Sequence, residues 1–68
     1  MDHLALEELR GSIADAIDKL DDMILALLRD AVAAGERVRP AAERRLVRAR
    51  NALQRAAGLL LDDEDAEP

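Results

Sequence analysis

The chain has 68 residues, a formal net charge of −5, no aromatic residue and no cysteine. A chain of this length forms one domain at most, and a purely aliphatic core lacks the large buried area that aromatic side chains supply. Without cysteine, the chain holds neither a disulfide nor a thiolate metal site. Self-association is the remaining way to stabilise so small a fold.

The start of the chain, MDHLALEELR, carries acidic residues where a secretory signal peptide carries basic ones. The uninterrupted apolar stretches are short, as at 23–28, whereas a bilayer-spanning helix needs about 20 apolar residues. We therefore expect a cytoplasmic protein with no membrane-spanning segment.

Apolar residues spaced alternately by three and four predict a first helix over about 3–34, with a seam of the coiled-coil type. The seam consists of Ile13, Ile17, Leu20, Ile24, Leu27, Ala31 and Ala34. Leu6 extends this seam towards the N-terminus, although Arg10 then falls on it.

Both ends of this helix have suitable capping residues. Asp2 is the expected N-cap, and Gly35 is expected to stop the helix. Gly11 weakens the middle, because glycine inside a helix costs roughly 1 kcal/mol relative to alanine. Ser12 followed by Asp15 could cap a fresh helix. The sequence favours one continuous helix and leaves a break at Gly11–Ser12 as the alternative.

A second helix is predicted over about 40–58, after a turn at 35–39, with Pro40 in its first turn. Its seam alternates small and large residues: Ala42, Leu46, Ala49, Leu53, Ala56 and Leu60. Gly58 is expected to end the helix, which leaves 59–61 to fold back onto the hairpin.

The connection between the two helices is short, which is typical of antiparallel neighbours. We therefore predict an all-α helical hairpin over residues 1–61. Residues 62–68 hold five acids and no base, and we expect this acidic tail to be disordered.

Residues 23–34 are apolar on more than one side, because Leu25, Leu28 and Val32 form a second stripe beside the seam. One partner helix covers one stripe, so the other is expected to be an association surface. Two hairpins packed into a four-helix bundle would cover both, which favours a homodimer. A different helical protein in the same groove is the alternative. The predicted protein interface comprises Ile17, Leu20, Ile24, Leu25, Leu27, Leu28, Val32, Leu46, Leu53 and Leu60.

The charges are segregated along the chain. Residues 1–35 hold eight acids and three bases, residues 36–61 hold two acids and seven arginines, and the tail is acidic, so the net charges are −5, +5 and −5. Arg45 and Arg50 flank the second seam. We expect them to pair with first-helix carboxylates, for which the candidates are Asp15, Asp18, Asp21 and Asp22.

Arg44, Arg48 and Arg55 are predicted on the outer face of the second helix, where they could follow a phosphate backbone. In size and layout the chain resembles the Rop-type plasmid RNA-binding proteins, which are small helical hairpins that dimerise and end in an acidic segment. The likeness rests on no shared motif, so no RNA-contacting residue is carried over. The chain has no aromatic side chain for base stacking, and its overall acidity opposes non-specific binding to polyanions.

The residue types that carry catalysis are nearly absent. His3 is the single histidine, at the start of the chain, and Ser12 is the single serine, explained as a surface or capping residue. The first-helix aspartates lack the Glu-x-x-His motif of metal sites in helical bundles. We therefore expect no enzyme, no metal and no cofactor.

The segment IDKLDDMILALLRD at 17–30 resembles the first helix of AroQ-type chorismate mutases, which form an intertwined helical dimer. The resemblance covers fourteen of the 68 residues. Ala31 stands where that family has a substrate-binding arginine shortly after its Leu-Leu pair, and Ala14 stands at its earlier arginine. The third helix of the family is also missing, so the resemblance implies a noncatalytic relative at most.

From the sequence we expect a non-enzymatic helical adaptor or regulatory accessory protein that acts through protein–protein interaction, with itself and with another protein as partners. A nucleic-acid-binding hairpin that uses the arginine stripe is the alternative, and a noncatalytic relative of the mutases is the third interpretation.

Overall fold

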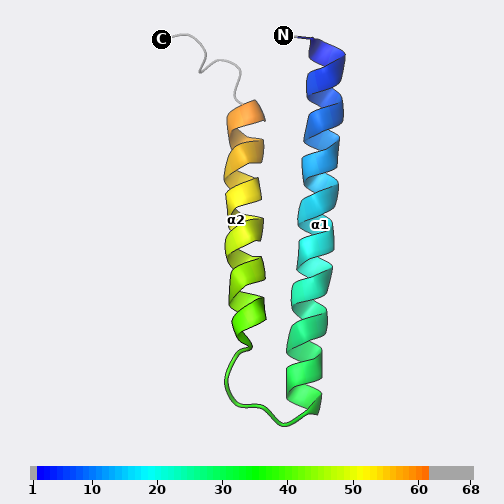
Figure 1. Ribbon diagram of the computed structural model, residues 1–68. Helices are drawn as coiled ribbons and strands as arrows, with labels where there is room; N and C mark the ends of the chain where they lie inside the picture. Colours follow the sequence, from blue (N-terminus) through cyan, green and yellow to red (C-terminus); the bar gives the residue numbers. More distant parts are fainter. Residues whose placement is uncertain (1, 62–68) are drawn as a thin grey trace.

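The computed structural model describes residues 2–61, and the predicted disorder of the acidic tail at 62–68 lies outside the described residues. Two helices, α1 (His3–Ala33) and α2 (Ala41–Leu61), pack side by side in antiparallel directions, with no strand among the described residues (Figure 1). The start of α1 and the end of α2 therefore lie at the same end of the molecule. The predicted all-α hairpin is confirmed.

The helix α1 begins and continues as the sequence predicts. The Asp2 side chain accepts a hydrogen bond from the backbone N–H of Leu4 at 3.0 Å, as an N-cap does. The helix then runs through Gly11 and Ser12 without a break. The predicted continuous helix is therefore confirmed. The helix stays intact because the seam on either side of the glycine packs against the same partner helix.

The end of α1 is a glycine stop. Gly35 has φ +77°, a left-handed conformation that a residue with a Cβ adopts only with strain. The Gly35 N–H donates to the Val32 carbonyl at 3.0 Å, and the Glu36 N–H donates to the Ala31 carbonyl at 2.9 Å. This pair of bonds is the Schellman motif, which satisfies carbonyls that the helix end leaves open.

The helix α2 begins close to the predicted start and ends later than predicted. It begins at Ala41, and the carbonyl of Pro40 accepts hydrogen bonds from Glu43 N–H at 3.1 Å and Arg44 N–H at 3.4 Å. The prediction that Gly58 ends the helix, with 59–61 folding back, is wrong, because α2 continues to Leu61.

A contact from the other helix explains the longer α2. The guanidinium of Arg10 donates a hydrogen bond to the backbone carbonyl of Leu60. That carbonyl belongs to the last turn, where the helix supplies no partner and where the dipole favours a cation. Arg10, the charged residue on the α1 seam, therefore caps α2 from the side.

The seam of α2 is rotated relative to the prediction. Leu46, Leu53 and Leu60 face α1 as expected, but Ala42 and Ala49 are exposed. The second inward row is instead Glu43, Arg50 and Ala57, and Glu43 is only 1 % exposed. Glu43 and Arg50 have longer side chains than alanine, and the head of each finds a polar partner.

The glycines of α1 and the turn offer a matched test. We expect Gly35→Ala to lower the free energy of unfolding by about 1 kcal/mol, because alanine is strained at this φ. Gly11→Ala should raise it by about 0.5–1 kcal/mol, since an added Cβ meets no atom within 4 Å. Urea unfolding followed by circular dichroism at one protein concentration measures both. Equal effects of the two substitutions would contradict this account of the turn.

Candidate interaction surfaces

The hairpin has almost no interior of its own. Among the described residues, only two hydrophobic side chains are buried, Leu6 at 7 % and Ala31 at 9 % exposed. The large hydrophobic side chains left exposed are Leu4, Leu9, Met23, Leu25, Val32, Val38, Leu59 and Leu61. Exposed apolar side chains in this number make the surfaces that carry them candidates for association.

The predicted interface residues separate into two groups. One group lies half-buried between α1 and α2 and forms the contact within the chain: Ile17, Leu20, Ile24, Leu27, Leu46, Leu53 and Leu60. The other group is Leu25, Leu28 and Val32, which we call the α1 stripe. Leu25 is 50 % and Val32 is 76 % exposed, whereas Leu28 is half-buried. As predicted, α2 leaves this stripe uncovered.

The α1 stripe forms a shallow depression of about 360 Å³. Its lining residues are Leu25, Leu28, Arg29, Val32 and Ala33. All of them come from α1, so the stripe is the flank of one helix and is wide enough for one further helix.

A second apolar surface lies between the helices on the other side of the hairpin. It is a groove of about 390 Å³, which we call the open groove. Its walls are Met23, Ala26, Leu27 and Asp30 of α1 and Ala42, Arg45 and Leu46 of α2. Met23 and Leu25 are two residues apart, which is about 200° around a helix, so the open groove and the α1 stripe face opposite directions.

Sequence reasoning missed the open groove because it placed Ala42 and Ala49 in the seam. The groove was detectable from the heptad spacing: Met23, Ala16 and Leu9 follow one another at seven residues on α1. Ala42, Ala49 and Ala56 do the same on α2. Residues seven apart lie on one side of a helix. Met23 and Ala42 both line the open groove, so the two rows run along the same side of the hairpin.

An ion pair joins the two helices on the broad side of the hairpin that lies opposite the open groove. Arg50 Nε donates to Asp21 Oδ1 at 2.9 Å, and Arg50 Nη1 donates to Gln54 Oε1 at 2.7 Å. The predicted pairing of Arg50 with a first-helix carboxylate is confirmed, with Asp21 as its partner. Since Asp21 also lies about 200° from Met23, the pair faces away from the open groove.

A buried carboxylate marks the turn end of the hairpin. Glu43 Oε2 accepts a hydrogen bond from Arg39 Nη2 at 2.7 Å. Glu43 Oε1 is buried and has no hydrogen-bond partner among the described residues. Arg39 is largely exposed, so one solvated arginine holds a carboxylate that the fold has removed from water.

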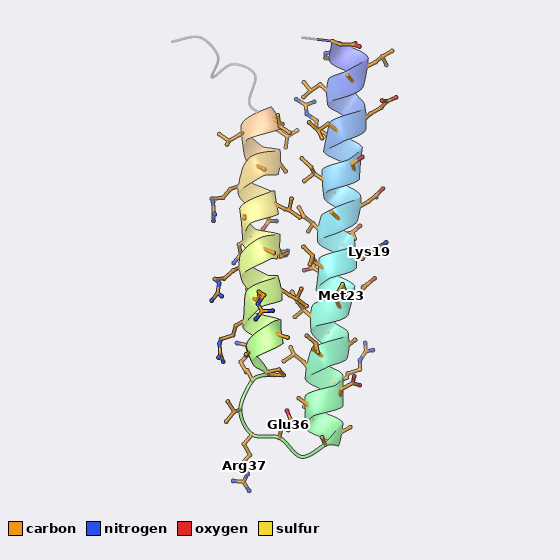
Figure 2. All side chains as sticks on the ribbon, in the orientation of Figure 1. Lys19, Met23, Glu36 and Arg37 are labelled. Atoms are coloured by element: carbon orange, nitrogen blue, oxygen red, sulfur yellow. The ribbon has the colours of Figure 1, made fainter. Side chains whose placement is uncertain are left out.

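Arg44, Arg48 and Arg55 are exposed, as the sequence predicts for the outer face of α2. In Figure 2 several nitrogen-tipped side chains project from α2 on the side turned away from α1. Arg44 also donates a hydrogen bond to the Arg39 carbonyl at 3.4 Å. The same view shows Lys19 pointing away from α2 and Arg37 pointing away from both helices.

Residues 2–61 contain no candidate metal centre. No group of three or more His, Asp or Glu side chains in that range could hold a metal ion. His3 and Ser12 are both exposed. Neither described helix is long and apolar enough to cross a membrane.

Comparison of the chain with protein-family models, with curated proteins and with solved structures gives no match.

The Glu43–Arg39 pair can be tested by removing each partner. We expect Arg39→Ala to lower the free energy of unfolding by about 1 kcal/mol, because it leaves a buried carboxylate without its donor. Glu43→Leu should be neutral or stabilising, because leucine at this seam position packs on α1 and needs no partner. Urea unfolding measures both, with Arg37→Ala as the control for loss of a turn arginine. A larger loss for Glu43→Leu than for Arg39→Ala would contradict the interpretation.

Proposed function

We propose that this protein is a non-enzymatic helical module that pairs with a copy of itself and binds another protein. The observation that carries the proposal is the uncovered apolar surface: a hairpin with two buried hydrophobic side chains exposes apolar residues on two opposite sides. One surface accommodates a copy, and the other remains for a second protein. A paired hairpin with a free binding surface is what an adaptor or regulatory accessory requires.

Self-pairing is supported by the small number of hydrophobic side chains that one hairpin buries. Each helix has one neighbour, so most leucines of the seam are only half-buried. Small domains that cannot build a sufficient core gain stability from disulfides, metals or oligomerisation. The chain has no cysteine, and residues 2–61 contain no metal-ligand cluster. A four-helix bundle of two hairpins therefore supplies the missing burial.

Binding of another protein is supported by the shape and chemistry of the α1 stripe. The stripe is apolar, belongs to one helix and has Arg29 at its rim. These features fit an amphipathic helix of a partner that lays its apolar face along Leu25, Leu28 and Val32. Such a contact depends on apolar burial, so its affinity should change little with salt.

Nucleic-acid binding is the second candidate, and the exposure of Arg44, Arg48 and Arg55 favours it. An arginine stripe on an outer helix face can contact phosphates in sequence. The outward carboxylates of α1 and the net charge of −5 weaken it, because they repel a polyanion.

Self-pairing predicts a concentration-dependent mass. We expect sedimentation of the full chain to show a dimer at micromolar concentrations, with helix content that rises as the dimer forms. The reason is that the second hairpin covers apolar surface that one hairpin exposes. A stable, fully helical monomer at high micromolar concentration would refute self-pairing.

The two candidate functions differ in their response to salt. We expect no measurable binding of a short RNA duplex at about 0.15 M salt. If RNA binds at low salt, its affinity should fall by roughly one power of salt concentration for each phosphate contacted. Replacing Arg44, Arg48 and Arg55 with glutamine should then flatten this dependence, while Arg37→Gln serves as the control. Tight RNA binding at physiological salt would favour the nucleic-acid function.

A further inference from the structure

We propose that the second copy packs on the open groove, with the turns of the two hairpins at the same end of the bundle. This inference rests on the proposed self-pairing and names its surface and its orientation. The occupant is a second copy of this chain, and the α1 stripe stays outside the dimer.

The composition of the open groove suits a second helical layer. Both helices contribute to its walls, and half-buried Leu27 and Leu46 line it beside exposed Met23 and Ala42. The alanines of α2 recur at seven residues, so small side chains face the incoming layer along the helix. Small side chains allow helices to approach at the lower end of the usual interaxial range of about 8–10 Å.

The area of this side is sufficient for a stable dimer. The Cα atoms span 51 × 23 × 11 Å, so the molecule is a flat plate of two helices. One broad side therefore has a projected footprint of roughly 1,000 Å², which is of the same order as the about 800 Å² of accessible surface that each partner buries in a typical stable interface. The α1 stripe belongs to one helix and offers only part of that area.

The ion pairs of the hairpin also favour this side. The Arg50–Asp21 pair faces away from the open groove, so packing a copy there desolvates neither of its charges. Packing on the opposite side would bury that pair and the Arg50–Gln54 hydrogen bond, and buried charges stabilise poorly. The charged residues that do line the open groove are Asp30 on one wall and Arg45 on the other.

The charges of the two helices decide the orientation. The helix α1 carries seven acids and three bases, a net charge of −4, and α2 carries one acid and five bases, a net charge of +4. A two-fold axis in the interface that keeps the helices aligned allows two arrangements. With the turns at the same end, α1 lies on α2 of the second copy. With the turns at opposite ends, each helix lies on its own copy.

Only the same-end arrangement places opposite charges next to each other throughout. Each helix then has two adjacent neighbours of opposite charge, and the two copies of α1 lie on a diagonal. It also brings Asp30 of one copy towards Arg45 of the second copy, because both residues line the turn end of the groove. The opposite-end arrangement stacks −4 on −4 and +4 on +4. Like charges across an interface are unfavourable, so the same-end arrangement is selected.

The orientation can be measured with one label, because the chain has no cysteine. Val38 lies exposed in the turn, so Val38→Cys with a nitroxide label reports the distance between turns by pulsed electron spin resonance. Turns at the same end should give a distance within about 25 Å, since the bundle is two layers thick. Turns at opposite ends should give about 45 Å, the length of the 31 residues of α1.

The surface is tested by a matched pair of substitutions on α2. Ala49 lies one heptad beyond Ala42 of the groove wall, on the same side of α2. Ala49→Arg therefore places a charge on the side that the second copy would cover, and should weaken dimerisation at least about 100-fold in sedimentation, because the interface would bury that charge. Asn51→Arg adds the same charge to the same helix on an exposed position outside the groove, and should change the affinity less than about 3-fold. Met23→Lys, on the opposite wall, provides a second variant should Ala49→Arg lose its helix content.

The possible results separate this inference from the proposed function. A short distance together with the loss of the dimer in Ala49→Arg supports both. A dimer with the long distance overturns the orientation, and a dimer unaffected by Ala49→Arg and Met23→Lys overturns the surface, while self-pairing stands in both cases. A wild-type chain that sediments as a monomer at the labelling concentration overturns the inference and self-pairing together.

Discussion

Two helices lying side by side cannot enclose a hydrophobic core on all sides, and the rest of this structure depends on that constraint. Each helix has one neighbour, so one row of contacts is sheltered and both broad sides of the pair remain open to water. The half-buried seam leucines and the two buried hydrophobic side chains, Leu6 and Ala31, follow from this geometry. Longer helices would not remove the problem, because added turns extend the open sides along with the seam.

The polar contacts between the helices distinguish the two broad sides of the hairpin. Arg50 joins Asp21 across one side, and Arg10 holds the last turn of α2. Each contact is worth little as stabilisation when it is partly exposed, roughly 0–1 kcal/mol. They nevertheless set the register of the helices and make one side costly to bury. The Arg50–Asp21 pair does not face the open groove, so a second layer can form on that side without desolvating the pair.

Much of the fold could be predicted because it depends on local spacing. The seam of α1, its Asp2 cap and the Gly35 stop are properties of neighbouring residues, and the structure contains all three. The errors on α2 come from polar side-chain contacts, which the spacing of apolar residues does not show. Alanine at 42 and 49 is more apolar than Glu43 and Arg50, but the charged side chains have longer stems and find partners. Arg10 likewise extends α2 through a contact fifty positions away. The open groove was missed for the same reason. The face of α2 that contacts α1 differs from the predicted one, and this difference leaves Ala42 and Ala49 exposed.

Segregation of charge between the helices matters more for the choice of arrangement than for the strength of binding. The same-end and opposite-end dimers bury the same side of the hairpin, so their apolar contributions are similar, and a modest electrostatic difference decides between them. The screening length for exposed charges at physiological salt is about 8 Å. Adjacent helices lie about 8–10 Å apart, so charges on neighbouring helices are only partly screened from each other. In the proposed bundle, the acids of α1 and the arginines of α2 would therefore act across each contact between helices. Salt should weaken this preference, while the affinity, which depends on apolar burial in the groove, is maintained.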